Sequence, residues 1–401
     1  MATKTLLHHI QKIGPGMAVA ATGIGAADLI VSAVAGSKYG IAIVWTVVLG
    51  AWIKYVLNEG LGRWQMVTQT TVLEGWKAQF SPWVLHGFII YLFFWGFIVA
   101  GALIVSCGMA AHSLIPEISY KKWSVVHSLA GLVLVLWGGY GIFETIMKWT
   151  IAGMFALTIV TGILVFYHSP DLSLVMNFIP PKGSLPFLMG LIGGVGGSVT
   201  LLNYSYWIRE KGWQSVDKLP LIRWDLSLAY LLTGFFAVAM ILISSQINTQ
   251  EVSGYMMVEN LGKAIGRYTG RLGQIFFQVG FWAAVFSSLL GVWQGVPYIF
   301  QDYCQMTRRN LSPQKSYRSF LVFLAIPTLS LLFFSKPVWV VIAYAITGSL
   351  FMPFLAITLW IMNNRSHMEG WRNSMKDQIT YFIAVAGFLY LFSVELFKAL
   401  F

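Results

Sequence analysis

The chain has 401 residues, of which 57% are hydrophobic and only 10% are charged, and its mean hydropathy is +0.70. Soluble domains carry about 25% charged residues, so this composition excludes a soluble globular protein and indicates a polytopic membrane protein. The formal net charge of +11 does not indicate nucleic-acid binding, because the basic residues lie in short loops between apolar stretches. The two cysteines, Cys107 and Cys304, show no metal-site spacing.

Apolar stretches long enough to cross a bilayer recur along the chain. Each predicts a helix, because an isolated strand leaves its backbone groups unpaired in lipid. The eleven predicted spans cover residues 14–36, 41–66, 84–111, 122–140, 142–167, 184–207, 224–246, 271–303, 318–335, 338–362 and 378–400. No long polar stretch separates them, so we expect one membrane domain over residues 1–401.

Lysine and arginine are more numerous in the loops on the side of the N-terminus. This predicts a protein of the plasma (inner) membrane with a cytoplasmic N-terminus and an external C-terminus. Residues 1–167 and 184–362 each hold five predicted spans, and 378–400 is an added helix. Because five is odd, the two halves have opposite orientations in the membrane. That is the arrangement of an inverted repeat with its binding site near the midplane.

The first predicted span is interrupted at its midpoint by the sequence GIGAAD, residues 23–28. Glycines let a helix unwind and free backbone groups for a ligand, and a carboxylate at mid-membrane marks a functional site by default. Asp28 is therefore predicted to bind a cation or to couple transport; the alternative is that it caps the half-helix that follows. The candidate binding residues of this first break are Gly23, Gly25, Ala26, Ala27 and Asp28.

The sixth span contains a second break, with the sequence GGVGGS at residues 193–198. One reading is an unwound segment whose free N–H groups, at the start of a half-helix, bind an anion. The other is close helix packing through small residues. Two interrupted helices at matching places in two halves point to a transporter binding site. The candidate residues here are Gly194, Gly196, Gly197, Ser198 and Thr200.

A few other polar residues lie within the predicted spans. Ser287 and Ser288 are candidate sodium ligands and His86 a candidate proton carrier, so these three join Asp28 as coupling candidates. The alternatives are ordinary helix packing for the serines and a hydrogen-bonded structural role for His86 and His127.

Charged residues near the ends of the spans have simpler readings. Glu59 and Arg63, four residues apart, predict a pair on a helix surface, and Arg223, Asp225 and Asp302 are read as helix-end groups. No nucleotide-binding loop, hydrolase elbow or redox motif occurs. We therefore expect neither an enzyme nor a cofactor.

Several segments resemble the Nramp metal transporters. They are GPG at residues 14–16, AGSKYG at 35–40, the second span at 43–69, Asp225, FSSLLGVWQG at 286–295 and MPF at 352–354. The resemblance covers nearly the whole chain. It implies an all-α, amino-acid-transporter-like (LeuT-type) fold with a five-plus-five inverted repeat, here followed by an eleventh helix, and it implies a monomer.

The binding residues depart from the Nramp pattern. Nramp transporters carry Asp-Pro-Gly-Asn in the first break, where this chain has GAAD at residues 25–28. Their Met-Pro-His signature in the sixth helix is replaced by TLL at residues 200–202. Soft ligands such as methionine sulfur favour transition metals. The sequence therefore predicts that Mn²⁺ binds no better than in the millimolar range.

Three functions follow from these observations. The main reading is a secondary transporter of a small anion such as bicarbonate, held by N–H groups of residues 194–197, with Asp28 binding a coupling proton or sodium ion. The alternative is a divalent cation transporter of the Nramp type, for Mg²⁺ or Mn²⁺, with Asp28 as a metal ligand. The second alternative is a membrane scaffold or sensor that keeps the fold without transport.

Overall fold

The computed structural model describes residues 25–137, 141–168, 180–194, 197–213, 215–249, 251–252, 254–307, 312–334 and 336–400, which form helices and no strand. The first half contains η1 (Ala27–Val31), α3 (Ser32–Tyr39), η2 (Gly40–Ile43), α4 (Val44–Thr68), α5 (Val72–Gln79), α6 (Pro82–Leu114), α7 (Tyr120–Trp137) and α8 (Gly141–His168). The second half contains α9 (Leu185–Gly194), η4 (Val199–Leu202), α10 (Asn203–Glu210), η5 (Val216–Lys218), α11 (Leu219–Ser244), α12 (Met257–Thr307), α13 (Pro313–Ala325), η6 (Pro327–Phe333), α14 (Pro337–Ser349) and α15 (Phe351–Met362). The chain continues with η7 (Ser366–Met368) and α16 (Met375–Leu400).

The predicted all-α membrane fold is confirmed. Helix occurs within each of the eleven predicted ranges. Eight stretches of the described residues are long and apolar enough to cross a membrane. One of them, Asp28–Thr68, merges the first two predicted spans, because α3, η2 and α4 follow one another without a polar loop. Neither α7 nor α16 is among the eight, so the count of eleven spans stays a prediction.

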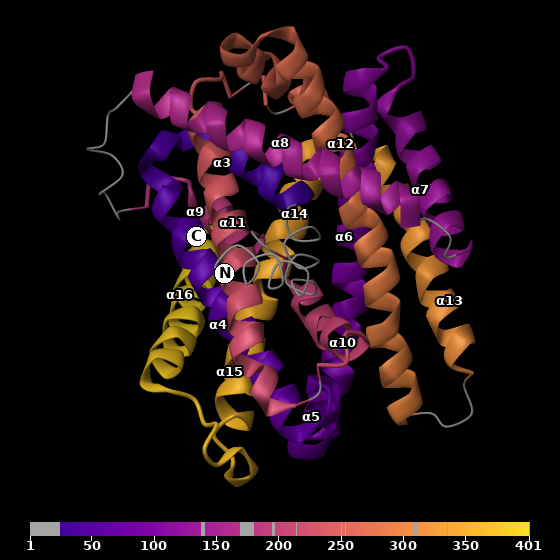
Figure 1. Cartoon of the computed structure of the whole chain (residues 1–401), viewed down its shortest axis with the longest axis vertical. Coiled ribbons are helices and arrows are strands. Elements are labelled where there is room, and N and C mark those ends of the chain that lie inside the picture. Colours follow the sequence, from indigo (N-terminus) through magenta and orange to yellow (C-terminus); the bar gives the residue numbers. More distant parts are fainter. Residues whose placement is uncertain are drawn as a thin grey trace, which may run out of the picture.

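The long helices run roughly along the long axis of the molecule, and α8 crosses them obliquely near one end (Figure 1). Helices α7 and α13 lie together at one edge, and α16 lies at the opposite edge (Figure 1). In the middle, α9 packs against α14, and α11 packs against α3 and α4. The short η1 contacts both α9 and α14. This packing brings the segment after the first break next to the helix that precedes the second.

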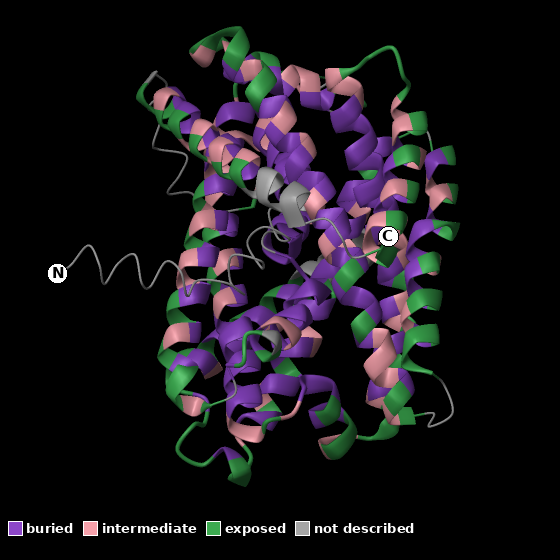
Figure 2. Ribbon diagram, turned by 45° about the vertical axis from the view of Figure 1, so that its right-hand side comes forward, coloured by how far each residue is buried: buried purple, intermediate pink, exposed green. Residues whose placement is uncertain are grey.

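Buried residues fill the interior, and exposed residues cover the outer faces of the helices (Figure 2). The outer faces include large apolar side chains, such as Trp83, Trp137, Leu272 and Phe333, which are all exposed. Exposed apolar side chains on helices of this length suit contact with lipid rather than water. Helix α4 is the opposite case, because its residues 56–66 are all buried.

Glycines shape the helices in two different ways. Gly193 and Gly190 allow close packing: a Cβ at Gly193 would collide with the backbone of Ser349 in α14, and one at Gly190 would press on Val31 of η1. Gly270 instead bends α12, with φ 73° and ψ −178°, which strongly favours glycine. The bend lies directly before the predicted eighth span, so residues 257–269 form a separate helical arm.

Candidate functional site

Asp28 lies in a widened turn of helix at the first break. It is the second residue of the π-helical segment η1, and its exposure is 0%. The N-cap position belongs to Ala26, which has helical φ and ψ. The capping interpretation of Asp28 is therefore wrong, because the residue already lies inside the helix. A π-helical turn in this position is typical of functional sites.

The other candidate residues of the first break are only partly described. Gly25 and Ala26 are buried, and the Gly25 carbonyl accepts a hydrogen bond of 3.1 Å from the Leu29 N–H. This bond closes the first turn, so the helix is already wound from residue 25. Gly23 lies outside the described residues, and only the backbone of Ala27 is described.

Lys54 of α4 interacts electrostatically with Asp28, and this residue is absent from the sequence-based candidates. Its exposure is 0%, and Asp28 acts electrostatically on its ammonium group. An ionisable residue within a membrane span marks a functional site by default. That signal was present in the sequence, since Lys54 stands inside the apolar second span. The structure adds the partner, which lies on a different helix.

Neutral polar groups lie near Asp28 and Lys54. Asn58, one turn beyond Lys54 on α4, donates a hydrogen bond of 3.1 Å from Nδ2 to the Tyr230 hydroxyl on α11. Tyr230 and Tyr344 of α14 both interact electrostatically with Asp28. The Asn58 Oδ1 atom is buried without a hydrogen-bond partner in the described structure. A buried carbonyl oxygen with no partner costs about 1–3 kcal/mol, which favours a water or ion at this position.

The second break lies where the sequence predicted it. Helix α9 ends at Gly194, Gly197 has φ +92°, and the chain resumes as the 3-10 segment η4 before α10. The Gly197 N–H donates a 3.0 Å hydrogen bond to the Gly194 carbonyl. That group is therefore not free for an anion, which corrects the expectation for this N–H. Gly196 lies outside the described residues.

The structure brings the two breaks together through α14. Tyr344 faces Asp28 and also lies beside Ser198, and Ser198 packs on Gly348 one turn further along α14. Thr200 is buried, with its Oγ1 atom directly over Gly197. Asn203, fully buried at the start of α10, has no hydrogen-bond partner for either amide atom in the described structure. Asp28, Lys54, Ser198 and Thr200 therefore belong to one buried polar region.

The remaining coupling candidates lie on α6 and α12. His86 Nδ1 lies 2.9 Å from the Tyr303 hydroxyl, near the start of α6. Ser287 and the buried Ser288 lie on α12, two turns before Gly295, which packs against Asn203. His127 accepts a 2.7 Å hydrogen bond from the Trp282 Nε1–H, which supports its structural role.

The Glu59–Arg63 pair exists but is buried rather than on the surface. Arg63 Nη2 lies 3.4 Å from Glu59, and its Nη1 lies 3.1 Å from Asp377 at the start of α16. Arg223 of α11 lies 2.9 Å from Glu59. The surface prediction was wrong because α11 and α16 cover this face of α4. Glu59, Arg63, Arg223 and Asp377 are called the anchor network below.

Two further aspartates are not simple helix-end groups. Asp225 is buried within α11 and accepts a 3.3 Å hydrogen bond from the Tyr204 hydroxyl. Asp302 accepts a 2.7 Å hydrogen bond from the Tyr206 hydroxyl. Both tyrosines belong to α10, so these bonds tie the helix after the second break to α11 and α12.

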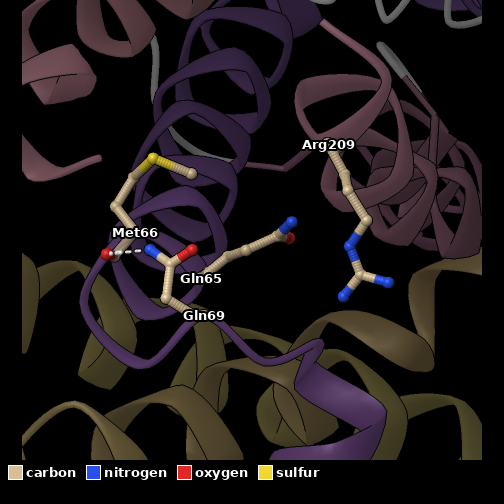
Figure 3. A pocket seen from close by; sticks show the side chains of 4 residues that line it. All are labelled: Gln65, Met66, Gln69 and Arg209. Atoms are coloured by element: carbon tan, nitrogen blue, oxygen red, sulfur yellow. Dashed lines mark hydrogen bonds between the residues drawn. The ribbon is translucent and has the colours of Figure 1, made fainter. Parts of the chain in front are cut away.

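A cavity of about 270 Å³ lies where α4 approaches α10, lined by Gln65, Met66, Gln69 and Arg209. The Gln65 and Arg209 side chains point toward one another across it, and Gln69 donates to the Met66 carbonyl (Figure 3). Gln65 follows Lys54 by eleven residues, about 16 Å along the helix at 1.5 Å per residue. Three helical turns therefore separate this cavity from the Asp28–Lys54 pair.

Metal-binding side chains are sparse in the part of the chain that the structure describes. No group of three or more His, Cys, Asp or Glu side chains comes together there. The region around Asp28 instead offers one carboxylate, hydroxyls and an amide oxygen. Such oxygen donors suit hard cations rather than soft ones.

A sequence model of the family described as natural resistance-associated macrophage protein-like (Nramp) matches residues 16–397. This chain belongs to the Nramp family. Nramp proteins are membrane transporters, so the chain is an integral membrane protein of a transporter family. A search of curated proteins found no match.

Solved structures confirm the Nramp-type fold. Two variants of the manganese transporter of Eremococcus coleocola are 14% and 15% identical, with TM-scores of 0.69 and 0.70. In both cases the match covers 93% of this chain and 84% of the other. MhsT in complex with L-phenylalanine is 16% identical with a TM-score of 0.62, covering 95% of this chain and 97% of that one. At these identities the likeness establishes the fold and not the cargo.

Proposed function

We propose that this chain is a secondary transporter that moves a small inorganic ion by alternating access, with Asp28 as the central binding residue. The observation that carries the proposal is a fully buried carboxylate on a π-helical turn, beside a second broken helix. Broken helices at the interface of two repeats are where transporters of this architecture hold their ions. Membership of the Nramp family supports the same class of function.

A divalent metal cation, Mg²⁺ or Mn²⁺, is the first candidate cargo. The family and the structural likeness to manganese transporters support this alternative better than the bicarbonate reading. Asp28 supplies one carboxylate, and the Asn58 Oδ1 atom is an available oxygen donor. This set lacks a sulfur ligand, so we expect little preference for Mn²⁺ over Mg²⁺.

A small anion such as bicarbonate is the second candidate, and Lys54 is the observation that favours it. A fully buried ammonium group beside Asp28 opposes a divalent cation and attracts an anion. In this reading Asp28 binds a coupling proton or sodium ion. In the cation reading, the Lys54 side chain has to leave Asp28 when the metal binds.

Uptake by the purified protein in liposomes tests the proposal. Mn²⁺, Mg²⁺ and labelled bicarbonate are offered separately, with protein-free liposomes as the background. Uptake of a divalent cation above background supports the first candidate, and uptake of bicarbonate alone supports the second. Uptake of none of the three, by protein that remains folded, would contradict the transporter proposal and favour the scaffold or sensor.

A further inference from the structure

Asp28 and Lys54 bring one negative and one positive charge to the buried site. Both side chains are fully buried, and they reach the site from η1 and α4. Three polar groups near the pair, Asn58, Tyr230 and Tyr344, are neutral. The charges of Asp28 and Lys54 therefore cancel each other when both residues are ionised.

Lys54 is one of three groups that interact electrostatically with Asp28 in the described structure. The other two are the tyrosines Tyr230 and Tyr344, and hydroxyl groups are good hydrogen-bond donors to a carboxylate. A lysine in a membrane span is costly and is normally retained for a function. Its ammonium is a compact point charge on a flexible stem, which suits interaction with a small ion.

The sign of a bound ion decides how it interacts with this pair. A cation is attracted by Asp28 and repelled by Lys54, whereas an anion experiences the reverse. Because Coulomb interactions are several-fold stronger in a buried site than in water, removing either charge strongly changes the preference. Asn58, on the same face of α4 as Lys54, offers both an amide N–H group and a carbonyl oxygen and so does not select a sign.

We propose that Lys54 determines ion specificity: its ammonium group weakens the binding of divalent cations at Asp28 and supplies the charge that holds a small oxyanion such as bicarbonate. This inference rests on the proposed function, because it takes the Asp28 region as the ion-binding site. It deepens that function by assigning the choice between the two classes of cargo to one residue. Removing Lys54 moves the site toward cations, and removing the charge of Asp28 moves it toward anions.

Calorimetric titration of the purified protein with Mn²⁺, and separately with bicarbonate, tests the proposal. Lys54→Met should bind Mn²⁺ at least about tenfold more tightly than the wild type, and Asp28→Asn at least about tenfold more weakly; tenfold corresponds to about 1.4 kcal/mol. Bicarbonate affinity should change in the opposite direction in each variant. Lys54→Arg, which keeps the charge, should retain the wild-type preference.

Lys38→Met is the matched control, because Lys38 is an exposed lysine at the end of α3 that lies over the Phe187 ring. It removes the same charge from the protein and should leave both affinities unchanged. Since a single charge left buried can prevent folding, the double variant Asp28→Asn with Lys54→Met serves as a second test. It contains neither charge, so it should fold and should bind both ions more weakly than the wild type.

Several results would overturn the proposal. One is a folded Lys54→Met protein whose affinities for Mn²⁺ and bicarbonate equal those of the wild type, since this would make Lys54 a structural counter-ion. A second is a double variant that keeps the wild-type affinities for both ions. A third is that neither the single variants nor the double variant binds Mn²⁺ or bicarbonate. Failure of the proposed function is a different result: no ion uptake by wild-type liposomes, while the titrations still show the opposite shifts.

Discussion

Helix α4 carries two clusters of buried charge that are built differently. In the anchor network, Arg63 contacts both Glu59 and Asp377, and Glu59 also contacts Arg223. Arg63 additionally donates to the Asn373 side chain and to the Arg372 carbonyl. At the other cluster, Lys54 interacts electrostatically with Asp28, and Asn58 and Tyr230 are neutral polar neighbours.

The difference indicates separate roles for the two clusters. The anchor network joins α4 to α11 and to the start of α16, and Arg223 reaches the surface with 47% of its side chain exposed. Such a network holds helices in place. Lys54 and Asp28 are fully buried, and Asp28 lies on η1, which contacts α9 before the second break. We therefore expect changes to the first cluster to alter stability and changes to the second to alter ion binding.

Arg63→Met should have the largest effect on stability. Removing this guanidinium breaks the buried ion pair with Asp377 and leaves Glu59 with Arg223, and breaking a buried ion pair costs about 3–5 kcal/mol. The melting temperature in detergent should fall strongly, whereas the ratio of Mn²⁺ to bicarbonate affinity should stay unchanged. Arg365→Met, at an exposed arginine, is the control. A changed ion preference in a folded Arg63→Met protein would contradict the separation of roles.

Gly197→Ala should have the next largest effect. At φ +92° an alanine is strained, and its Cβ would collide with Thr200 Oγ1, so the cost is about 1–3 kcal/mol. Because Gly197 belongs to the site, the transport rate should fall more than the melting temperature. Gly193→Ala, at the packing contact with Ser349, should show the reverse. Equal profiles for the two variants would remove the distinction between break and packing glycines.

Tyr230→Phe should have a moderate effect centred on the site. It removes the hydroxyl that accepts the hydrogen bond from Asn58, which is worth about 1 kcal/mol. The ring and its packing remain, so the fold should be kept while ion affinity changes. Calorimetry beside thermal melting checks this. An unchanged affinity for every ion would place Tyr230 outside the binding site.

Arg223→Met should have the smallest effect. Its ion pair with Glu59 is 2.9 Å long but half-exposed, and such pairs contribute under about 1 kcal/mol. Glu59 keeps Arg63 as a partner after the substitution. Melting temperatures of Arg223→Met and Arg63→Met measured side by side test the ranking. A larger loss in Arg223→Met would show that the exposed pair is the main tie between α4 and α11.

The sequence predicted the helices and the second break, because apolar length, glycine clusters and helical spacing are local signals. The i, i+4 spacing also predicted the Glu59–Arg63 contact, but not its burial, which depends on how α11 and α16 pack. Lys54 was missed as a partner of Asp28 because the two residues lie on different helices. Tyr230 and Tyr344 were missed for the same reason, since tertiary packing alone brings them to Asp28.

The measurement that tests the central claim most directly is ion uptake by Asp28→Ala in liposomes. Asp217→Ala is the control, because Asp217 is an aspartate with 62% of its side chain exposed. The account predicts that Asp28→Ala abolishes uptake of the ion that the wild type transports, while the protein stays folded in detergent and the control transports normally. Full uptake by folded Asp28→Ala protein would contradict the claim that this carboxylate is the centre of the transport site.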